Sequence, residues 1–412
     1  MPNPIELIEL DRARASGGER DRVQPSALAL AYTANGVAGP ETTTRDGSQR
    51  AVWLVALPLG AYALALFMIS AAVPYAPALD DPEWGTLARY FAAHGELDPG
   101  GLFRRVPLWQ ILLGSGVALI GERAAVVGLQ ALCVAAVLGG LAWRAKRGLA
   151  SERATLGVAL AFALSPQALL YSRHAATELA IGALACGIWL LASQTTLRAA
   201  AWAGAAAGAA TMIKLAALVA GLTGVLLVLQ VRDRRASRLA AFAAGFALVV
   251  IPLVVLAVAQ RGWPLDDTSS FNLSRLDQDT WLAAGSVAIR NELALESFRS
   301  AWGEGAGAYL AAAAGRAGGW LMRPSSLDLL TWIPSYPALW VELGDHVLFF
   351  GGLTLALLGT TRSSWPLWLL PIAFWLACSF PLKTPYSPKV AALIPLLLLA
   401  PLGIDSLRRR PS

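Results

Sequence analysis

Charged residues and cysteine are scarce in this chain of 412 residues, and each shortage excludes a class of protein. Charged side chains make up 15% of the sequence, against about 25% in soluble globular domains, while hydrophobic residues make up 56%. Cys133, Cys186 and Cys378 lie apart within apolar runs, so they form neither a disulfide framework nor a zinc cluster. These shortages exclude a soluble enzyme, a disordered chain and a fibrous repeat. We expect an all-α polytopic membrane protein.

The formal net charge is +6, and nearly all of the positive charge comes from arginine. In a soluble protein such a balance suggests nucleic-acid binding, but in a membrane protein the position of each charge matters more than the sum. We therefore expect membrane lipids as partners, and no nucleic acid. The bias toward Ala, Gly and Arg is typical of a GC-rich bacterial genome, which favours the bacterial cytoplasmic membrane as the location.

Composition divides the chain into five parts. Residues 1–50 are polar, mixed in charge and without lasting periodicity, which indicates a disordered cytoplasmic tail. The other parts are a transmembrane core at 51–260, a large extracytoplasmic loop at 261–346, C-terminal transmembrane helices at 347–405 and a cytoplasmic tail at 406–412.

Spanning helices need roughly 20 apolar residues each, and the sequence offers about ten such stretches. We place them near 51–73, 123–143, 155–172, 176–194, 199–213, 215–231, 239–260, 347–361, 363–380 and 389–405. The stretch at 199–231 is interrupted only by Lys214, so it is either a short hairpin of two helices or one long helix with a re-entrant piece.

The distribution of Arg and Lys predicts the orientation in the membrane. If the N-terminus is cytoplasmic, the internal loops carry Arg144, Lys146, Arg147, Arg153, Arg198, Arg232, Arg234, Arg235, Arg238, Arg362 and Arg408 to Arg410. The opposite face carries acid-rich loops, and the loop at 261–346 has six arginines against ten Asp or Glu. This is the positive-inside pattern, which predicts that both termini are cytoplasmic.

The first outer loop, 74–122, begins with an acidic cluster. Asp81 followed by Pro82 is a helix-start signal, with the acid as N-cap and proline at the first helical position. Trp84, Leu87 and Phe91 then share one face of a short helix, which we expect to lie in the membrane interface and to end at Gly95. That leaves Asp80 as either a solvated loop acid or a functional carboxylate.

Two adjacent arginines, Arg104 and Arg105, follow in the same loop, before an apolar stretch that runs to Gly121. Cations beside the outer leaflet oppose the positive-inside tendency. A guanidinium offers a planar fork of donors suited to phosphate, although snorkelling to lipid headgroups accounts for the same position equally well.

A third polar group lies where Pro166 is expected to kink or unwind the helix at 155–172. Tyr171, Arg173, His174 and Glu178 then cluster at the outer boundary, where ionisable groups are functional candidates. The competing interpretation is an ion pair between Arg173 and Glu178 that holds two helices together, with His174 in a structural role.

Further charges occur later in the chain. Lys214 is accommodated if the chain turns there at the outer surface, and Lys383 and Tyr386 belong to the last outer loop. In the loop at 261–346, Asp277 and Asp279 are more often solvated than metal-binding in such a setting. We expect no cofactor and no metal site, with a divalent metal as the open alternative.

Taken in order, these segments resemble the GT-C superfamily of integral membrane glycosyltransferases. The similarity is carried by Asp80-Asp81-Pro82-Glu83-Trp84, Arg105-Val106-Pro107-Leu108-Trp109, Ser165-Pro166 with Tyr171-Ser172-Arg173, and Thr211-Met212-Ile213-Lys214. The branch it resembles most is the protein O-mannosyltransferase and lipid A aminoarabinose transferase group. The similarity covers residues 51–231 well and 380–405 weakly.

The resemblance implies a GT-C-like fold with interfacial helices in the first outer loop. It implies transfer of a sugar from a polyprenyl phosphate to an acceptor hydroxyl on the extracytoplasmic face, with inversion. By the same resemblance Asp80 is the catalytic acid of the acidic pair with Asp81, and Arg105 is the cation that binds the lipid phosphate.

Two positions depart from the family pattern. Arg105-Val106-Pro107-Leu108 stands where the family often has Lys-Pro-Pro-Leu, which keeps the charge. Pro385-Tyr386 stands in place of the usual Arg-Tyr, so Tyr386 binds the lipid phosphate only if Lys383 or Lys389 replaces the missing arginine.

Residue chemistry by itself agrees with this reading. Inverting transfer needs a base near the acceptor hydroxyl and cations for the departing phosphate. Asp80 supplies the first, and Arg105, helped by Arg104, Arg173 or Lys214, supplies the second. The sequence leaves open whether the acceptor is a glycan, a lipid or a protein. The rival hypotheses are a transporter or lipid flippase and a non-catalytic scaffold that binds lipid carriers.

Overall fold

The computed structural model describes residues 44–76, 81–97, 105–261, 278–283, 287–323, 338–361, 364–379 and 388–408. Their regular secondary structure is helical throughout, with no strand among them, which confirms the all-α expectation. All of these residues belong to the unit formed by residues 42–412. Most of the predicted N-terminal tail, residues 1–43, lies outside the described residues, and the first helix begins at Thr44, before the predicted start at 51.

The helices of the first part of the chain follow one another with short connections. They are α3 (Thr44–Ala72), α4 (Asp81–His94), α5 (Pro107–Ile120), α6 (Glu122–Lys146), α7 (Glu152–Ala163), α8 (Pro166–Tyr171), α9 (Glu178–Ala192), α10 (Leu197–Ile213), the 3-10 turn η1 (Leu215–Ala217), α11 (Leu218–Gln230) and α12 (Arg235–Arg261).

The later helices include one π-helical segment. They are α14 (Gln278–Ala283), α15 (Val287–Gly303), α16 (Ala306–Met322), α18 (Ala338–His346), the π-helix η2 (Val347–Gly351), α19 (Gly352–Leu358), the 3-10 turn η3 (Trp365–Trp368), α20 (Leu369–Ser379), α21 (Pro388–Leu397) and α22 (Ala400–Arg408).

Within the described residues, four helices are long and apolar enough to cross a membrane: Val52–Ala72, Glu122–Lys146, Arg235–Arg261 and Leu339–Leu358. The pair α21 and α22, bent by 48°, adds a fifth if it is counted as one span. The other apolar helices are shorter: Pro107–Ile120, Glu178–Ala192, Leu215–Gln230 and Trp365–Leu376. Each predicted span overlaps a helix, but the number ten is not confirmed and stays a prediction.

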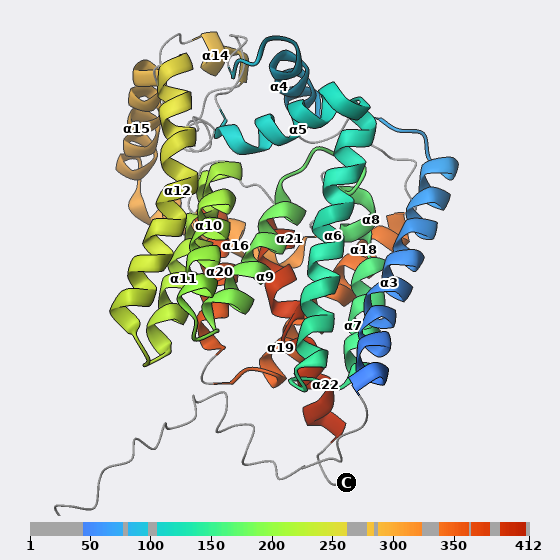
Figure 1. The fold of residues 1–412 in the computed structure, drawn as a ribbon. Helices are drawn as coiled ribbons and strands as arrows, with labels where there is room; N and C mark the ends of the chain where they lie inside the picture. Colours follow the sequence, from blue (N-terminus) through green and yellow to red (C-terminus); the bar gives the residue numbers. More distant parts are fainter. Residues whose placement is uncertain are drawn as a thin grey trace, which may run out of the picture. The chain divides into compact units, whose positions relative to one another are not determined.

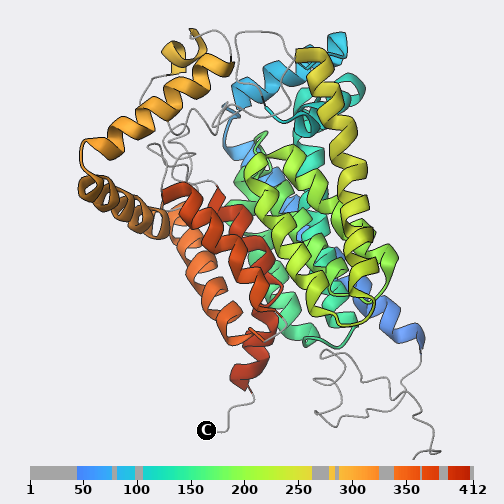
Figure 2. The same ribbon diagram turned by 90° about the vertical axis from the view of Figure 1, so that its left-hand side faces the viewer.

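The helices α6, α9, α10, α11 and α12 run side by side, and α4 and α5 lie across one end of them (Figure 1). That end is opposite to the end at which α3 begins and α22 lies. Figure 2 shows the C-terminal helices, orange to red, beside the green helices of the core, where α21 packs on α9 and α20 packs on α11. We call the end that carries α4 and α5 the α4–α5 end.

Close packing of α10 on α12 depends on small residues. Gly204 faces the carbonyl of Phe242, and Gly245 faces the carbonyl of Ala201, so near that a Cβ atom at either glycine would collide with backbone. Small residues let helix backbones approach in this way when lipid offers no hydrophobic drive for association. The contact positions the short α10 against the much longer α12.

Two local predictions are confirmed by the structure, and an alternative that the sequence left open is decided. The helix predicted at 155–172 breaks at Ser165, which caps α8, with Pro166 in the first turn. Gly95 ends α4 with a φ of 69°, a conformation that glycine adopts without strain. At 199–231 the chain forms two helices that pack on each other, with Lys214 in extended conformation between them.

The structure refines the prediction for the first outer loop. Its helix α4 begins at Asp81 itself, within the usual uncertainty of helix ends. The expected apolar face is present, since Trp84 and Leu87 are buried and Phe91 is half-buried. That face packs mainly against α5 rather than being left for lipid.

Candidate functional site

The connection between α8 and α9 gathers four of the predicted site residues at the α4–α5 end. Tyr171, Arg173, His174 and Glu178 lie on or beside this connection, and all four are buried. Ionisable side chains are costly to bury in a membrane protein, so they indicate either function or a firm structural role.

Two side chains of the connection reach the end of α3. Arg173 donates a hydrogen bond of 2.7 Å from its guanidinium to the carbonyl of Val73. The ring of His174 stacks on Tyr75 with 5.8 Å between ring centroids, and the guanidinium of Arg123 lies 5.2 Å from the centre of the same tyrosine ring. The segment after α3 is therefore held against the connection on one side and contacts the start of α6 through Tyr75.

The backbone of the connection is held by side chains from α5 and α6. An irregular buried segment leaves carbonyl groups that no helix satisfies, so they need other donors. The indole Nε1 of Trp109 donates to the carbonyl of Ala175 at 2.9 Å. The amide Nε2 of Gln130 donates to the carbonyls of His174 at 2.9 Å and Ala176 at 2.5 Å. The sequence analysis named Trp109 only as part of a motif and did not name Gln130, although an isolated amide in an apolar stretch was the available signal.

Lys214 and Glu178 form an ion pair beneath α5. The Nζ of Lys214 lies 3.0 Å from Oε1 of Glu178, whose side chain is 5% exposed against 24% for the lysine. The α10 helix has 17 residues and its neighbour α12 has 27, a difference of about 15 Å in length. Because Arg238 of α12 donates to the carbonyl of Gln194, just before α10, the two helices start near each other. The ion pair is therefore set back from the far end of α12.

Arg105 lies at the start of α5 and is paired with the first turn of α4. Its guanidinium is 2.5 Å from Oε2 of Glu83, and the two side chains are 7% and 14% exposed. The same guanidinium lies over the ring of Trp84, 5.6 Å from the ring centroid. The sequence had assigned Arg105 to phosphate binding, and it gave no sign of this partnership with Glu83.

Several predicted site residues cannot be placed. Asp80, Arg104, Lys383 and Tyr386 lie outside the described residues. For Asp81 the structure describes the backbone, as the first residue of α4, but not the side chain.

A second buried polar group joins the C-terminal helices to α8. The carboxylate of Asp345 accepts a short hydrogen bond from the amide of Gln167. Lys389 is 1% exposed, and its Nζ donates to the carbonyls of Leu321 at 2.9 Å and Arg323 at 3.0 Å. These contacts hold the end of α16 against α21, so the ammonium of Lys389 is directed to backbone rather than to a lipid phosphate. Sequence reasoning had not singled out Asp345 or Gln167.

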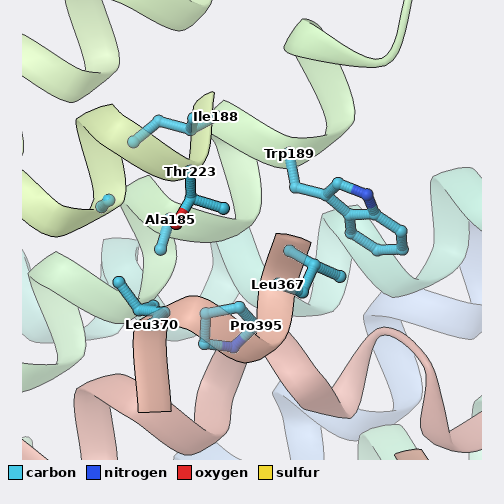
Figure 3. A pocket seen from close by; sticks show the side chains of 8 residues that line it. Ala185, Ile188, Trp189, Thr223, Leu367, Leu370 and Pro395 are labelled. Atoms are coloured by element: carbon cyan, nitrogen blue, oxygen red, sulfur yellow. The ribbon is translucent and has the colours of Figure 1, made fainter. Parts of the chain in front are cut away.

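The described residues also bear on metals and cavities. Among them, no group of three or more His, Cys, Asp or Glu side chains is arranged to hold a metal ion. A small apolar cavity lies between α9, α11 and the C-terminal helices, with about 10 Å³ available to the centre of a water molecule (Figure 3). It is lined by Ala185, Ile188, Trp189, Ala220, Thr223, Leu367, Leu370 and Pro395. Such a space is about the size of one water molecule, and its lining is apolar apart from Thr223 and the indole of Trp189.

Comparisons of the chain with protein-family models, with curated proteins and with solved structures found no match. The family assignment therefore depends on the ordered sequence motifs and is a proposal.

Proposed function

We propose that this chain is an integral membrane glycosyltransferase that moves a sugar from a polyprenyl phosphate to an acceptor hydroxyl. The observation that supports this most is the burial of Arg105 against the first turn of α4, the helix that Asp80 directly precedes in the chain. Inverting transfer needs one carboxylate to take a proton and at least one cation to receive phosphate. Both groups belong to this one part of the chain.

In the proposed reaction the acceptor oxygen attacks the anomeric carbon while the bond from that carbon to the phosphate oxygen breaks on the opposite face. Asp80 takes the hydroxyl proton, with Asp81 beside it in the sequence, and the lipid phosphate leaves with the electron pair. Arg105 offsets the charge that develops on the phosphate. Arg173, which contacts the backbone at the end of α3, adds positive potential to the same region, and Lys214 adds less because Glu178 pairs with it.

We also propose about ten spanning helices with both termini in the cytoplasm and the α4–α5 end outside. The charge distribution favours this orientation, because Arg144 and Arg147 at the end of α6 and Arg235 at the start of α12 lie at the opposite end. A bacterial cytoplasmic membrane is the location that the composition favours.

Label transfer tests the proposed function. The purified full chain, reconstituted in lipid, is given radiolabelled polyprenyl-phosphate sugars and a membrane extract as acceptor. We expect transfer by the wild type and a loss of about 10²-fold or more in Asp80→Asn. The matched control is Asp233→Asn, because Asp233 is an exposed aspartate between α11 and α12. Gel filtration checks that each variant is folded.

Two outcomes would contradict parts of this proposal. Equal transfer by wild type and Asp80→Asn would remove Asp80 as the base and direct attention to Asp81 and Glu178. Absence of transfer with every donor tried would contradict the glycosyltransferase assignment itself.

A transporter or flippase is the second candidate, and one observation favours it. Asp345 is buried within the candidate span Leu339–Leu358, and Lys389 is buried at the start of the bent pair α21 and α22; transporters also carry ionisable residues in their spans. A flippase would move a fluorescent polyprenyl phosphate across proteoliposomes and lose that activity in Lys389→Met. A glycosyltransferase transfers label without such movement.

A further inference from the structure

The ion pair between Glu83 and Arg105 differs from a second ion pair that α4 makes. Arg89 of α4 and Glu122 of α6 also pair, at 2.6 Å, but their side chains are 56% and 39% exposed. The Glu83–Arg105 pair is largely buried, with 14% and 7% exposure. Burying two charges costs solvation that their attraction often fails to repay, so such a pair is weak evidence for a role in stability.

Trp84 provides a second and independent observation beside this pair. The residue is 2% exposed, and its ring lies under the guanidinium of Arg105. Its indole Nε1 is buried and makes no hydrogen bond with any of the residues that the structure describes. A buried tryptophan usually finds an acceptor for this N–H group, so an unused donor next to an arginine points to an anionic ligand.

We infer that Glu83 occupies an anion site that Arg105 and Trp84 form for the phosphate of a polyprenyl-linked ligand. Binding requires the phosphate to displace the Glu83 carboxylate from Arg105, after which the indole Nε1 of Trp84 donates to a phosphate oxygen. The inference rests on the proposed function and deepens it, because it adds a built-in competitor and a second donor to the site.

When phosphate replaces the Glu83 carboxylate at Arg105, both anions have a favourable environment. A guanidinium binds phosphate oxygens with the same planar fork that it offers to a carboxylate. Glu83 is the third residue of α4, and a carboxylate in the first turn of a helix is stabilised by the helix dipole. The displaced Glu83 therefore retains a favourable environment near the start of α4.

The competitor has a consequence for selectivity. An anion that binds only through its charge must overcome the attraction between Glu83 and Arg105. Its apparent affinity is reduced by the fraction of molecules in which Glu83 has already left the guanidinium. A ligand that also buries a polyprenyl chain gains the energy to displace the carboxylate. The site thus discriminates against inorganic phosphate and in favour of a lipid-linked phosphate.

Binding to the purified full chain tests the inference with three probes: farnesyl phosphate, farnesol and inorganic phosphate. We expect Glu83→Gln to bind farnesyl phosphate about tenfold more tightly than the wild type, since a charge-assisted contact no longer competes. The affinity for inorganic phosphate should rise by at least the same factor, whereas the affinity for farnesol should be unchanged. Glu122→Gln is the matched control, because it breaks the exposed ion pair of the same helix and should leave all three affinities unchanged.

A second variant keeps the test decisive if Glu83→Gln proves unstable. Trp84→Phe keeps the aromatic ring and removes the Nε1 donor, so we expect several-fold weaker binding of farnesyl phosphate with unchanged binding of farnesol. Equal or weaker binding of farnesyl phosphate by Glu83→Gln would overturn the competitor while leaving the proposed function intact. Failure of wild type and both variants to bind farnesyl phosphate more tightly than farnesol would overturn the anion site and the proposed function together.

Discussion

Arg105 and Arg238 are both buried arginines, but they lie at opposite ends of the bundle and have different kinds of partner. The guanidinium of Arg238 donates to the backbone carbonyls of Val228, Ala192 and Gln194, at the ends of α11 and α9. The guanidinium of Arg105 pairs with the carboxylate of Glu83. Helix-end carbonyls cannot move away without loss of structure, whereas a glutamate side chain can rotate.

The comparison shows that burial alone does not distinguish a structural arginine from a ligand-binding one. Arg238 satisfies carbonyl groups that would otherwise lie unpaired at helix ends, which is a structural role. Arg105 has a partner that another anion can replace, and it lies beside an unused indole donor. The two ends of the bundle are therefore expected to respond differently to the same substitution.

Arg238→Met should have the largest effect, and the effect should be on stability. The change removes the donor from three carbonyls near helix ends, two of them on buried residues, at a cost of about 3 kcal/mol or more. Thermal unfolding and the yield of monodisperse protein measure it. Arg235→Met, on the exposed first turn of the same helix, is the control and should be close to wild type. Wild-type stability in Arg238→Met would contradict the structural role assigned to Arg238.

Arg105→Met should have the next largest effect, and the effect should be on transfer. We expect label transfer to fall about 10²- to 10³-fold, because the cation that offsets charge on the leaving phosphate is lost. Thermal stability should fall as well, because the largely buried Glu83 carboxylate loses its partner, although the first turn of α4 still favours its charge. Arg89→Met, at the exposed ion pair of α4, is the control. Transfer at the wild-type rate would contradict the assignment of Arg105.

Lys214→Met should reduce transfer less, by about tenfold. Lys214 contributes charge to the region but is partly exposed and already paired with Glu178. Steady-state kinetics against the lipid donor measure the change, and the exposed Lys146→Met at the end of α6 serves as control. A complete loss of transfer would contradict this auxiliary role and would place Lys214 at the reacting centre.

Gln130→Leu should have the smallest effect on transfer. The change removes the donor that satisfies the carbonyls of His174 and Ala176, which costs about 1–3 kcal/mol of stability. Transfer should fall only a few-fold, because Trp109 still holds the connection through Ala175. Thermal unfolding and label transfer on the same preparation measure both. Unchanged stability would show that Gln130 is not needed to hold the connection.

Features set by local chemistry were predictable from the sequence. The break at Ser165-Pro166 and the end of α4 at Gly95 each follow from the preferences of neighbouring residues, and the structure confirms both. At 199–231 the sequence left two alternatives open, and the structure shows two helices with Lys214 between them. The apolar face of α4 was also predictable from its spacing, although not the helix that covers it.

Contacts between distant parts of the chain were not predictable in this way. Gln130 meets a carbonyl 44 residues away, and Arg105 meets Glu83 across 22 residues. Such pairings depend on how whole helices pack, and no single-residue preference encodes that. The sequence therefore identified Arg105, Arg173 and Glu178 as candidates without identifying what each of them contacts.

The most direct test of the account is an experimental structure of the full chain in a lipid nanodisc with a polyprenyl phosphate bound. We expect the phosphate against Arg105 and the indole of Trp84, with the Glu83 carboxylate turned away from the guanidinium. Phosphate bound elsewhere, with the Glu83–Arg105 pair intact, would contradict the account.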